Sequence, residues 1–230
     1  MQLQDQHVVV TGGFGTLGMA VVQAALAAGA RVTAVDRARA PAADAPAGAQ
    51  LVGDVDLADA ATAAATFDRI AAAGGGLDAL VNVAGTFRWE TVEGGSLDTW
   101  DLLYRVNLRT AVAASKAALP HLITRGGGSI VNVGAGAAAK AGAGMGAYAA
   151  SKSGVARLTE ALAEELKDRA ITVNAVLPSI IDTPPNRADM PKADFDRWVK
   201  PAQLADVIVF LLSAQARAIT GALIPVSGRV

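Results

Sequence analysis

Val8-Val9-Val10-Thr11-Gly12-Gly13-Phe14-Gly15-Thr16-Leu17-Gly18 is the stretch of sequence that decides the fold. Its apolar run is typical of a strand buried on both faces, and it passes directly into a glycine-rich turn. A helical pattern follows from Thr16 and ends at Gly29. In such a unit, backbone N–H groups and the helix N-terminus can bind a pyrophosphate. The candidate phosphate-binding residues are Gly12, Phe14, Gly15, Thr16 and Leu17.

Strand and helix patterns alternate along the rest of the chain. Strands are predicted at 31–36, 50–53, 77–83, 129–133, 171–177 and 220–226, and helices at 56–72, 97–124, 146–167 and 201–213. This alternation predicts an α/β fold, a doubly wound parallel sheet of the Rossmann type with helices on both faces. No repeat or linker divides the chain, so residues 1–230 are expected to form a single domain.

Two longer connections interrupt this alternation. A Pro/Ala-rich loop is expected from residue 37 to about residue 49. The second connection, residues 178–200, contains four prolines and is too long for a simple link between elements. A loop of this length on such a scaffold is usually functional, so we expect a substrate lid there.

Composition excludes several classes of protein. The formal net charge is −1, which gives no basic surface for a nucleic acid or an anionic membrane. The chain has no cysteine, which excludes disulfides and thiol catalysis, and its two histidines lack the spacing of metal ligands. No signal peptide precedes the first strand and no apolar stretch reaches 18 residues, so a cytoplasmic protein without a metal is expected.

Tyr148 and Lys152 carry the chemistry. They are four residues apart in Tyr-Ala-Ala-Ser-Lys, so a helix places the phenol and the ammonium on one face. A nearby cation favours the phenolate, which predicts a pKa for Tyr148 below the usual value of about 10. A tyrosine tuned in this way can donate or accept a proton near neutral pH. Together with the phosphate-binding turn, the pair indicates hydride transfer.

Asp36 stands at the end of the second predicted strand, 18 residues after Gly18. A carboxylate there can accept hydrogen bonds from the adenosine ribose and repel a 2′-phosphate, which favours NAD over NADP. The neighbouring guanidinium of Arg37 could instead accommodate that phosphate. Further candidate cofactor contacts follow the next two strands, where this architecture binds ligands: Asp54, Val55, Asn82, Ala84 and Gly85.

The whole chain resembles the short-chain dehydrogenase/reductase family. The matching pieces, in the family's order, are residues 11–18, Asp54-Val55, Asn82-Val83-Ala84-Gly85, Asn107, Tyr148-Ala-Ala-Ser-Lys152 and residues 173–178. The resemblance implies that Tyr148 is the catalytic acid/base. It also implies that Lys152 tunes Tyr148 and binds the nicotinamide ribose, and that Asn107 belongs to a water relay to Lys152.

The same resemblance implies further contacts and an assembly. Pro178, Ile181 and Thr183, after the sixth strand, would contact the cofactor. The protein would act on a small-molecule substrate. It would form a homo-oligomer, a dimer or a tetramer, through the helices near 97–124 and 146–167, whose alanine-rich faces permit close approach.

One position departs from the family pattern in a way that matters for chemistry. The family's catalytic serine lies 13 residues before the tyrosine, and Ala135 stands there. Losing such a hydrogen-bond donor costs ketone reduction about 100- to 1000-fold in rate. The segment 177–198 resembles that of dihydropteridine reductases, family members that use NADH and also lack the serine. A quinonoid dihydropterin regains conjugation on accepting hydride, so it needs less electrophilic help.

The sequence leaves several readings open. The first is an NAD-linked reductase of a small conjugated carbonyl or imine. The second is a ketone reductase or hydroxy-compound dehydrogenase in which water replaces the serine, and the third is an NAD-binding module with little catalysis. In the 178–200 segment, four residues either contact the substrate or only pack: Asn186, Arg187, Phe195 and Trp198.

Overall fold

The computed structural model describes residues 1–41 and 46–230, so the middle of the expected Pro/Ala-rich loop lies outside the described residues. Seven parallel strands form one sheet in the order β3-β2-β1-β4-β5-β6-β7. The strands are β1 (His7–Thr11), β2 (Arg31–Val35), β3 (Ala49–Val52), β4 (Ala79–Asn82), β5 (Gly128–Val133), β6 (Ile171–Pro178) and β7 (Leu223–Val226). The predicted doubly wound sheet is confirmed.

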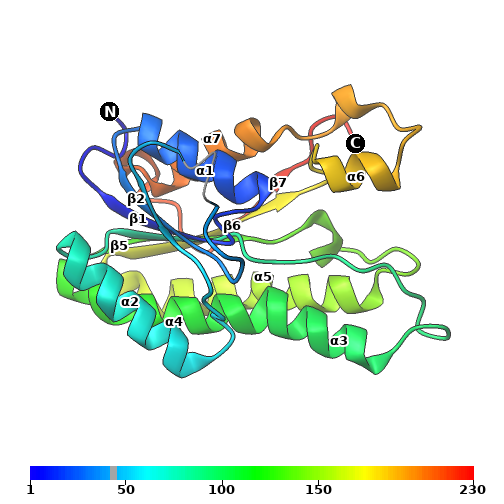
Figure 1. The fold of residues 1–230 in the computed structure, drawn as a ribbon, viewed down its shortest axis with the longest axis horizontal. Helices are drawn as coiled ribbons and strands as arrows, with labels where there is room; N and C mark the ends of the chain where they lie inside the picture. The colour runs from blue at the N-terminus through cyan, green and yellow to red at the C-terminus, as the bar shows by residue number, and fades with distance from the viewer. Residues whose placement is uncertain (42–45) are drawn as a thin grey trace.

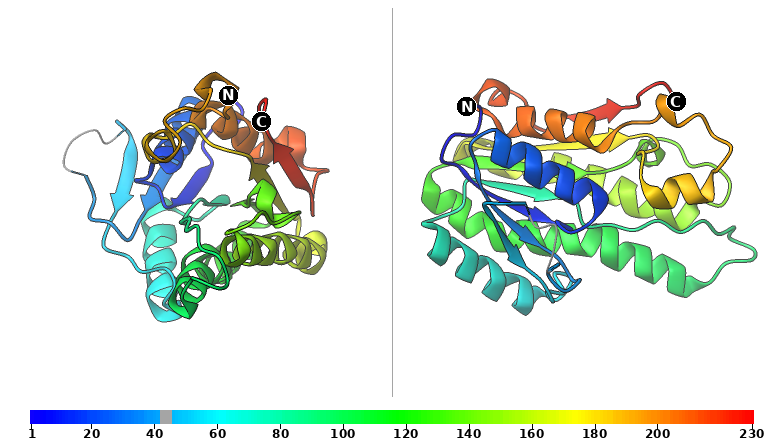
Figure 2. Two further views of the ribbon diagram at one scale, coloured as in Figure 1. Left: turned by 90° about the vertical axis from the view of Figure 1, so that its right-hand side faces the viewer. Right: turned by 45° about the horizontal axis from the view of Figure 1, so that its top comes forward.

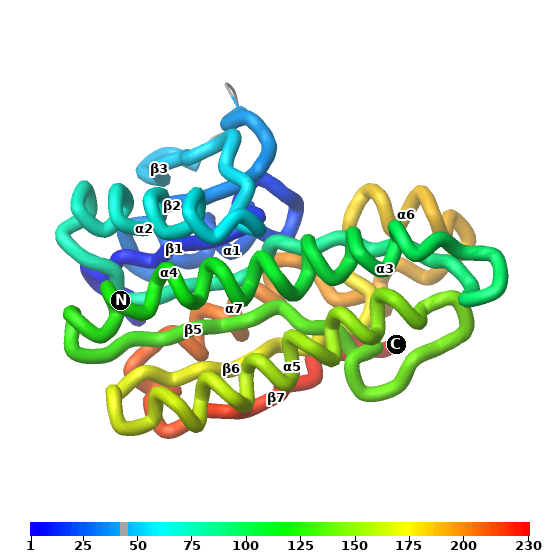
Figure 3. Tube along the Cα trace, turned by 90° about the horizontal axis from the view of Figure 1, so that it is seen from below, coloured from blue at the N-terminus to red at the C-terminus, as the bar shows by residue number. Residues whose placement is uncertain are grey.

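Helices cover both faces of the sheet (Figure 1). One face carries α1 (Thr16–Ala27) and α7 (Pro201–Leu212). The other carries α2 (Ala60–Gly74), α4 (Thr110–Arg125) and α5 (Gly146–Leu166), which lie side by side in front of the strands when this face is viewed (Figure 3). Two further helices, α3 (Leu97–Leu103) and α6 (Pro184–Asp189), extend beyond the sheet at its carboxyl end (Figure 1).

Alternating side chains of each strand supply two separate cores. In β1, Val8 and Val10 pack with α1 and α7, whereas Val9 packs with α2 and α4. The central strands read as continuous apolar runs because both of their faces are covered. Both termini lie on the same side of the sheet as α1 and α7 (Figure 2). Among the described residues, no helix is long and apolar enough to cross a bilayer.

Three elements differ from expectation. Helix α2 begins at Ala60 rather than residue 56, because the Asp59 side chain accepts a hydrogen bond from the Thr62 N–H and caps the helix there. The expected single helix 97–124 is interrupted by a π-helical turn, Tyr104–Arg109, which separates α3 from α4. The 178–200 segment contains α6 and a 3₁₀ turn, Phe195–Arg197, and is therefore not an irregular loop.

The core on the α2 side gives a stability prediction. Phe67 in α2 is 1 % exposed, and replacing it with alanine should lower the free energy of unfolding by about 3–5 kcal/mol, through lost transfer energy and the cavity left behind. Phe210 in α7 is 38 % exposed, so the matched Phe210→Ala change should cost about 1 kcal/mol or less. Urea unfolding of both variants measures the difference. Equal losses would contradict this assignment of the core.

Candidate active site

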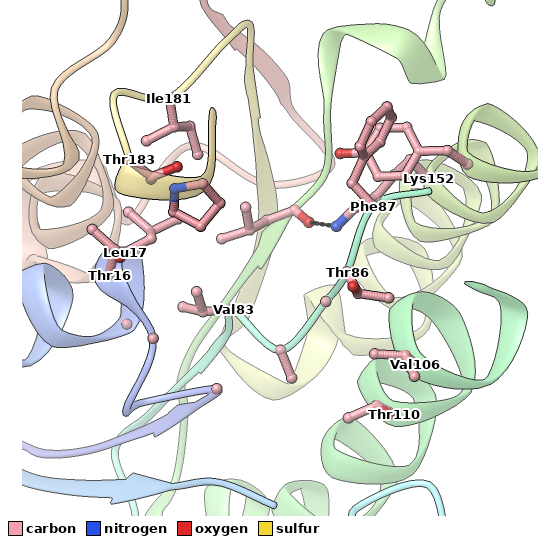
Figure 4. A pocket seen from close by; sticks show the side chains of 18 of the residues that line it. Thr16, Leu17, Val83, Thr86, Phe87, Val106, Thr110, Lys152, Ile181 and Thr183 are labelled. Carbon is pink, nitrogen blue, oxygen red and sulfur yellow. Dashed lines mark hydrogen bonds between the residues drawn. The ribbon is translucent and has the colours of Figure 1, made fainter. Parts of the chain in front are cut away.

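A cavity of about 750 Å³ opens at the carboxyl ends of the strands. It lies beside the point where the strand order reverses, between β1 and β4, which is the expected ligand position in an open α/β sheet. Figure 4 shows its walls: the turn before α1, the segment after β4, the π-helical turn, α5 and the start of the 178–200 segment.

Most of the sequence-predicted site residues line this cavity. Those that do are Gly12, Gly15, Thr16, Leu17, Asp36, Arg37, Val55, Ala84, Gly85, Tyr148, Lys152, Pro178, Ile181 and Thr183. Those that do not are Phe14, Asp54, Asn82 and Asn107. The structure thus brings together residues from both halves of the chain, and it places the remaining four outside the cavity wall.

The glycine turn is shaped by close backbone approach. Gly12 has φ +64°, and a Cβ added there would lie 2.7 Å from both Cα and N of Ala84. A Cβ on Gly18 would lie 2.0 Å from the Gly12 carbonyl oxygen. Only glycine permits both approaches. Helix α1 therefore begins at the cavity wall with the free N–H groups of its first turn at its start, an arrangement that suits an anionic group.

Asp36 faces this turn. Its carboxylate accepts hydrogen bonds from the N–H of Phe14 at 3.1 Å and the N–H of Ala38 at 3.0 Å. Phe14 therefore serves the site through its backbone, by orienting Asp36. Arg37 also lines the cavity, so both signs of charge are present at this end.

Asp54 and Asn82 have structural positions. Asp54 has φ +59°, and its N–H bonds to the carbonyl oxygen of Ala38, which closes the turn after β3. Asn82, only 3 % exposed, donates through Nδ2 to Oγ of Ser115 and to Oδ1 of Asn132, in a polar chain beneath the sheet. The Asn82 Oδ1 atom is buried without a hydrogen-bond partner among the described residues.

Lys152 lies on α5 and is 4 % exposed. Its ammonium donates a hydrogen bond to the Val133 carbonyl oxygen at 2.8 Å, as the dashed line in Figure 4 shows. The Tyr148 side chain comes from the preceding turn of the same helix, as the spacing predicts. The Phe87 ring packs edge-on against it, with 4.9 Å between ring centroids and 86° between planes.

The predicted lowering of the tyrosine pKa is wrong for the protein without a ligand. Burial raises the pKa of Tyr148 to about 12. Burial also lowers the pKa of Lys152 to about 8, because its ammonium is removed from water with one carbonyl as its hydrogen-bond partner. Desolvation outweighs attraction between the two groups. At neutral pH the pair is therefore a protonated phenol beside a protonated amine.

Asn107 occupies the π-helical turn and is 1 % exposed. Its Oδ1 accepts from the Thr86 N–H at 2.7 Å, while its Nδ2 donates to the Thr86 carbonyl oxygen at 3.0 Å and to Ser151 Oγ at 2.9 Å. A Cβ on Gly85 would lie 3.1 Å from Asn107 Oδ1 and 3.3 Å from Lys152 Nζ. Asn107 and Lys152 therefore converge on the backbone at Gly85, which lines the cavity.

Ala135 follows β5 and is 6 % exposed. Its carbonyl oxygen accepts a hydrogen bond from the Ala138 N–H at 2.9 Å, which starts a short 3₁₀ turn. Its methyl side chain supplies no hydrogen-bond donor after this strand. Phe87 is 45 % exposed and lines the cavity beside Tyr148.

In the 178–200 segment, Asn186 lines the cavity, but Arg187, Phe195 and Trp198 do not. Sequence reasoning missed several lining residues, chiefly apolar ones: Leu102, Val106, Thr110, Met145, Ile180, Pro185 and Met190. Leu102, Val106 and Thr110 lie on or beside the π-helical turn, which no sequence pattern indicated. The Met-Pro pair at 190–191 was the one signal available for Met190.

Comparison with known proteins identifies the family of this chain. The family profile described as short chain dehydrogenase matches residues 6–194. A D-threitol dehydrogenase of Mycolicibacterium smegmatis is 35 % identical over 99 % of this chain and 93 % of its own. A protein of Xanthobacter autotrophicus named inactive 2-(S)-hydroxypropyl-CoM dehydrogenase 2 is 34 % identical over 90 % of this chain and 98 % of its own.

A solved structure extends the agreement to three dimensions. The short-chain type dehydrogenase/reductase from Mycobacterium ulcerans superimposes with a TM-score of 0.90 at 27 % identity, covering 100 % of this chain and 90 % of that one. The profile match, the relatives above 30 % identity and the shared fold lead to one conclusion. The chain belongs to the short-chain dehydrogenase family of oxidoreductases.

Proposed function

We propose that this protein is an NAD-linked oxidoreductase that transfers hydride to a small conjugated carbonyl or imine, with Tyr148 supplying the proton. The observation that carries the proposal is the placement of Tyr148 and Lys152 on the wall of the cavity that also holds the glycine turn and Asp36. Family membership supports hydride chemistry with a nicotinamide cofactor.

The residues present fit a dinucleotide. The first turn of α1 would hold the pyrophosphate, because Gly12 and Gly18 leave room for it to approach the backbone. The Asp36 carboxylate, oriented by the Phe14 N–H, would accept hydrogen bonds from the adenosine ribose. Pro178, Ile181 and Thr183 would enclose the nicotinamide end. When bound, the cofactor supplies the hydride.

Tyr148 would protonate the substrate oxygen or nitrogen. Its raised pKa keeps the phenol protonated at neutral pH, which suits reduction. No hydrogen bond joins its hydroxyl to another described residue, which leaves it free to bond to a substrate. The Lys152 ammonium would stabilise the phenolate left behind, and Asn107 would help to resupply protons through water near Gly85.

Ala135 supports an electron-poor substrate. We propose that it occupies the position of the family's serine, so the carbonyl would meet Tyr148 without a second donor. A conjugated acceptor, such as a quinonoid dihydropterin, tolerates this loss better than an isolated ketone. The D-threitol dehydrogenase relative favours the second candidate, a hydroxy-compound dehydrogenase with water in place of the serine. The relative named inactive favours the third candidate, an NAD-binding module with little catalysis.

A homo-oligomer is also proposed. Apolar side chains stand exposed along α3, the π-helical turn and α4, at Leu97, Trp100, Tyr104 and Val112, with exposed fractions of 80, 38, 54 and 40 %. Successive members of this set are three, four and eight residues apart, so the side chains follow one side of α3, the π-helical turn and α4. A second copy that covered them would remove this apolar surface from water.

The first test measures NADH and NADPH oxidation with three kinds of acceptor: a quinonoid dihydropterin, quinones and simple ketones. Turnover with the conjugated acceptors is expected, with kcat/KM for NADH at least about tenfold above that for NADPH because Asp36 repels a 2′-phosphate. Asp36→Ser should reduce the ratio of kcat/KM for NADH to kcat/KM for NADPH. Turnover of ketones alone would favour the second candidate. Tight NADH binding without any turnover would favour the binding module.

Tyr148→Phe removes the proton donor and should lower kcat by about 100- to 10,000-fold. The dissociation constant for NADH, measured by fluorescence, should stay within about threefold, because the change deletes one hydroxyl and leaves the rest of the cavity wall in place. Retained turnover would show that another group supplies the proton.

The lowered pKa of Lys152 predicts a pH dependence. Its ammonium is present below about pH 8 and is lost above that value, so reductive kcat/KM for NADH should be level between pH 6 and 7.5 and fall above pH 8. This parameter reports the free enzyme, to which the pKa applies. A profile that stays level to pH 10 would contradict the role of the ammonium.

Ala135→Ser separates the two substrate readings. For a ketone substrate the new hydroxyl should raise kcat by about tenfold or more, since it restores a donor to the developing oxyanion. For a conjugated substrate the rate should barely change. Ser153→Ala serves as a control for hydroxyl content, since Ser153 Oγ donates to the Ala138 carbonyl oxygen in the turn that follows Ala135.

A further inference from the structure

Asp182 lies between two cavity-lining residues, Ile181 and Thr183, but is not itself part of the cavity wall. The carboxylate is 8 % exposed and binds two cations. The Arg187 guanidinium donates to both oxygens, through Nε at 2.5 Å and a terminal nitrogen at 2.8 Å. The Lys200 ammonium donates to Oδ2 at 2.8 Å. We call Asp182, Arg187 and Lys200 the Asp182 clamp.

The clamp joins both ends of the 178–200 segment. Arg187 comes from α6, and Lys200 immediately precedes α7. The Lys200 ammonium also donates to the Phe195 carbonyl oxygen at 2.9 Å. Backbone bonds run parallel to these side-chain contacts: the Asp182 N–H donates to the Val199 carbonyl oxygen at 2.8 Å. One carboxylate therefore closes a loop of 17 intervening residues.

Aromatic side chains complete the arrangement. The Arg187 guanidinium lies 4.6 Å from the centroid of the Phe195 ring, a favourable cation–π distance. Phe195 packs in turn on Trp198, with centroids 4.8 Å apart, and Trp198 is 4 % exposed. The clamp thus has a partly apolar base, and its bidentate Arg–carboxylate pair supplies two charge-assisted hydrogen bonds in a fixed geometry.

The carboxylate stays ionised throughout the neutral range. Hydrogen bonds from Arg187, and then from Lys200, hold the pKa of the Asp182 carboxyl well below its usual range. Its charge therefore persists at every pH where an oxidoreductase assay is run. An amide in its place would lose the charge while keeping nearly the same shape.

We propose that Asp182 is a positioning residue that holds the 178–200 segment in its cavity-lining conformation before any ligand binds. In this arrangement the clamp fixes the cavity-lining residues on both sides of Asp182 together, which are Ile181, Thr183, Asn186 and Met190. The proposal rests on the proposed function only where it concerns NADH. It gives Arg187, Phe195 and Trp198 a structural role in the segment and removes them from substrate recognition.

Hydrogen exchange of the ligand-free protein tests the proposal directly. Amides of residues 180–200 should be protected in the wild type without ligand. Asp182→Asn should speed their exchange by about tenfold or more. The matched control is Asp196→Asn in the same segment: Asp196 is 90 % exposed and lies 3.8 Å from Lys200, so its loss should leave exchange unchanged.

Kinetics give a second readout. With NADH and the best acceptor, Asp182→Asn should raise KM for NADH by about tenfold and leave kcat within about threefold, because a bound cofactor restores the wall. Asp182→Glu, which keeps the charge, should recover part of this loss. A fall in kcat with KM unchanged would overturn the positioning role.

The remaining outcomes also decide whether the proposal for Asp182 holds. Rapid exchange of residues 180–200 in the ligand-free wild type, or equal exchange in Asp182→Asn and Asp196→Asn, would overturn the proposal. If Asp182→Asn does not fold, Arg187→Gln, which keeps the Asp182–Lys200 ion pair, replaces it, and its hydrogen exchange is compared with that of Asp196→Asn. If no acceptor is turned over, the proposed function fails while the exchange experiment still decides on the clamp, because it needs no activity.

Discussion

The close approach of the Gly12 backbone to Ala84 is the constraint on which the site depends. It brings the turn after β1 against the segment after β4, across the point where the strand order reverses. Helix α1 then starts at the mouth of the crevice, and the segment after β4 leads away to Thr86 and Phe87. The other candidate functional groups surround these two segments: Asp36 follows β2, Asn107 lies in the π-helical turn, and Tyr148 and Lys152 lie on α5. The site follows from parallel strands that end together.

Charge burial is the second theme. The buried Lys152 ammonium has the Val133 carbonyl oxygen as its hydrogen-bond partner in place of water, and this desolvation lowers its pKa. The Asp182 carboxylate is also largely shielded from water, but it accepts hydrogen bonds from the cations of Arg187 and Lys200, and these lower its pKa. The two groups differ in how well they are paired. A poorly paired charge at Lys152 is ready to act on a ligand, whereas a well-paired charge at Asp182 holds structure.

Local sequence signals predicted the elements well and the contacts between them less well. Apolar runs and glycine positions predicted all seven strands, and the turn after β1 placed the crevice correctly. The π-helical turn escaped because its i to i+5 bonding leaves no distinctive residue pattern around Asn107. The sign of the Tyr148 shift escaped because i,i+4 spacing gives distance but not burial. Long-range packing also explains why Arg187 and Trp198 face away from the cavity.

The π-helical turn Tyr104–Arg109 also has a consequence for the outer surface of the protein. A π turn contains about one residue more than the α-helical turn it replaces. Because that turn is wide, it accommodates the extra residue and leaves α3 and α4 almost in phase. If the same residues were wound as a regular α-helix, α3 would rotate about the helix axis by about 100° relative to α4. Leu97 and Trp100 would then no longer share a side with Val112. The wide turn thus keeps an apolar stripe aligned on the outside while Asn107 is buried on the inside.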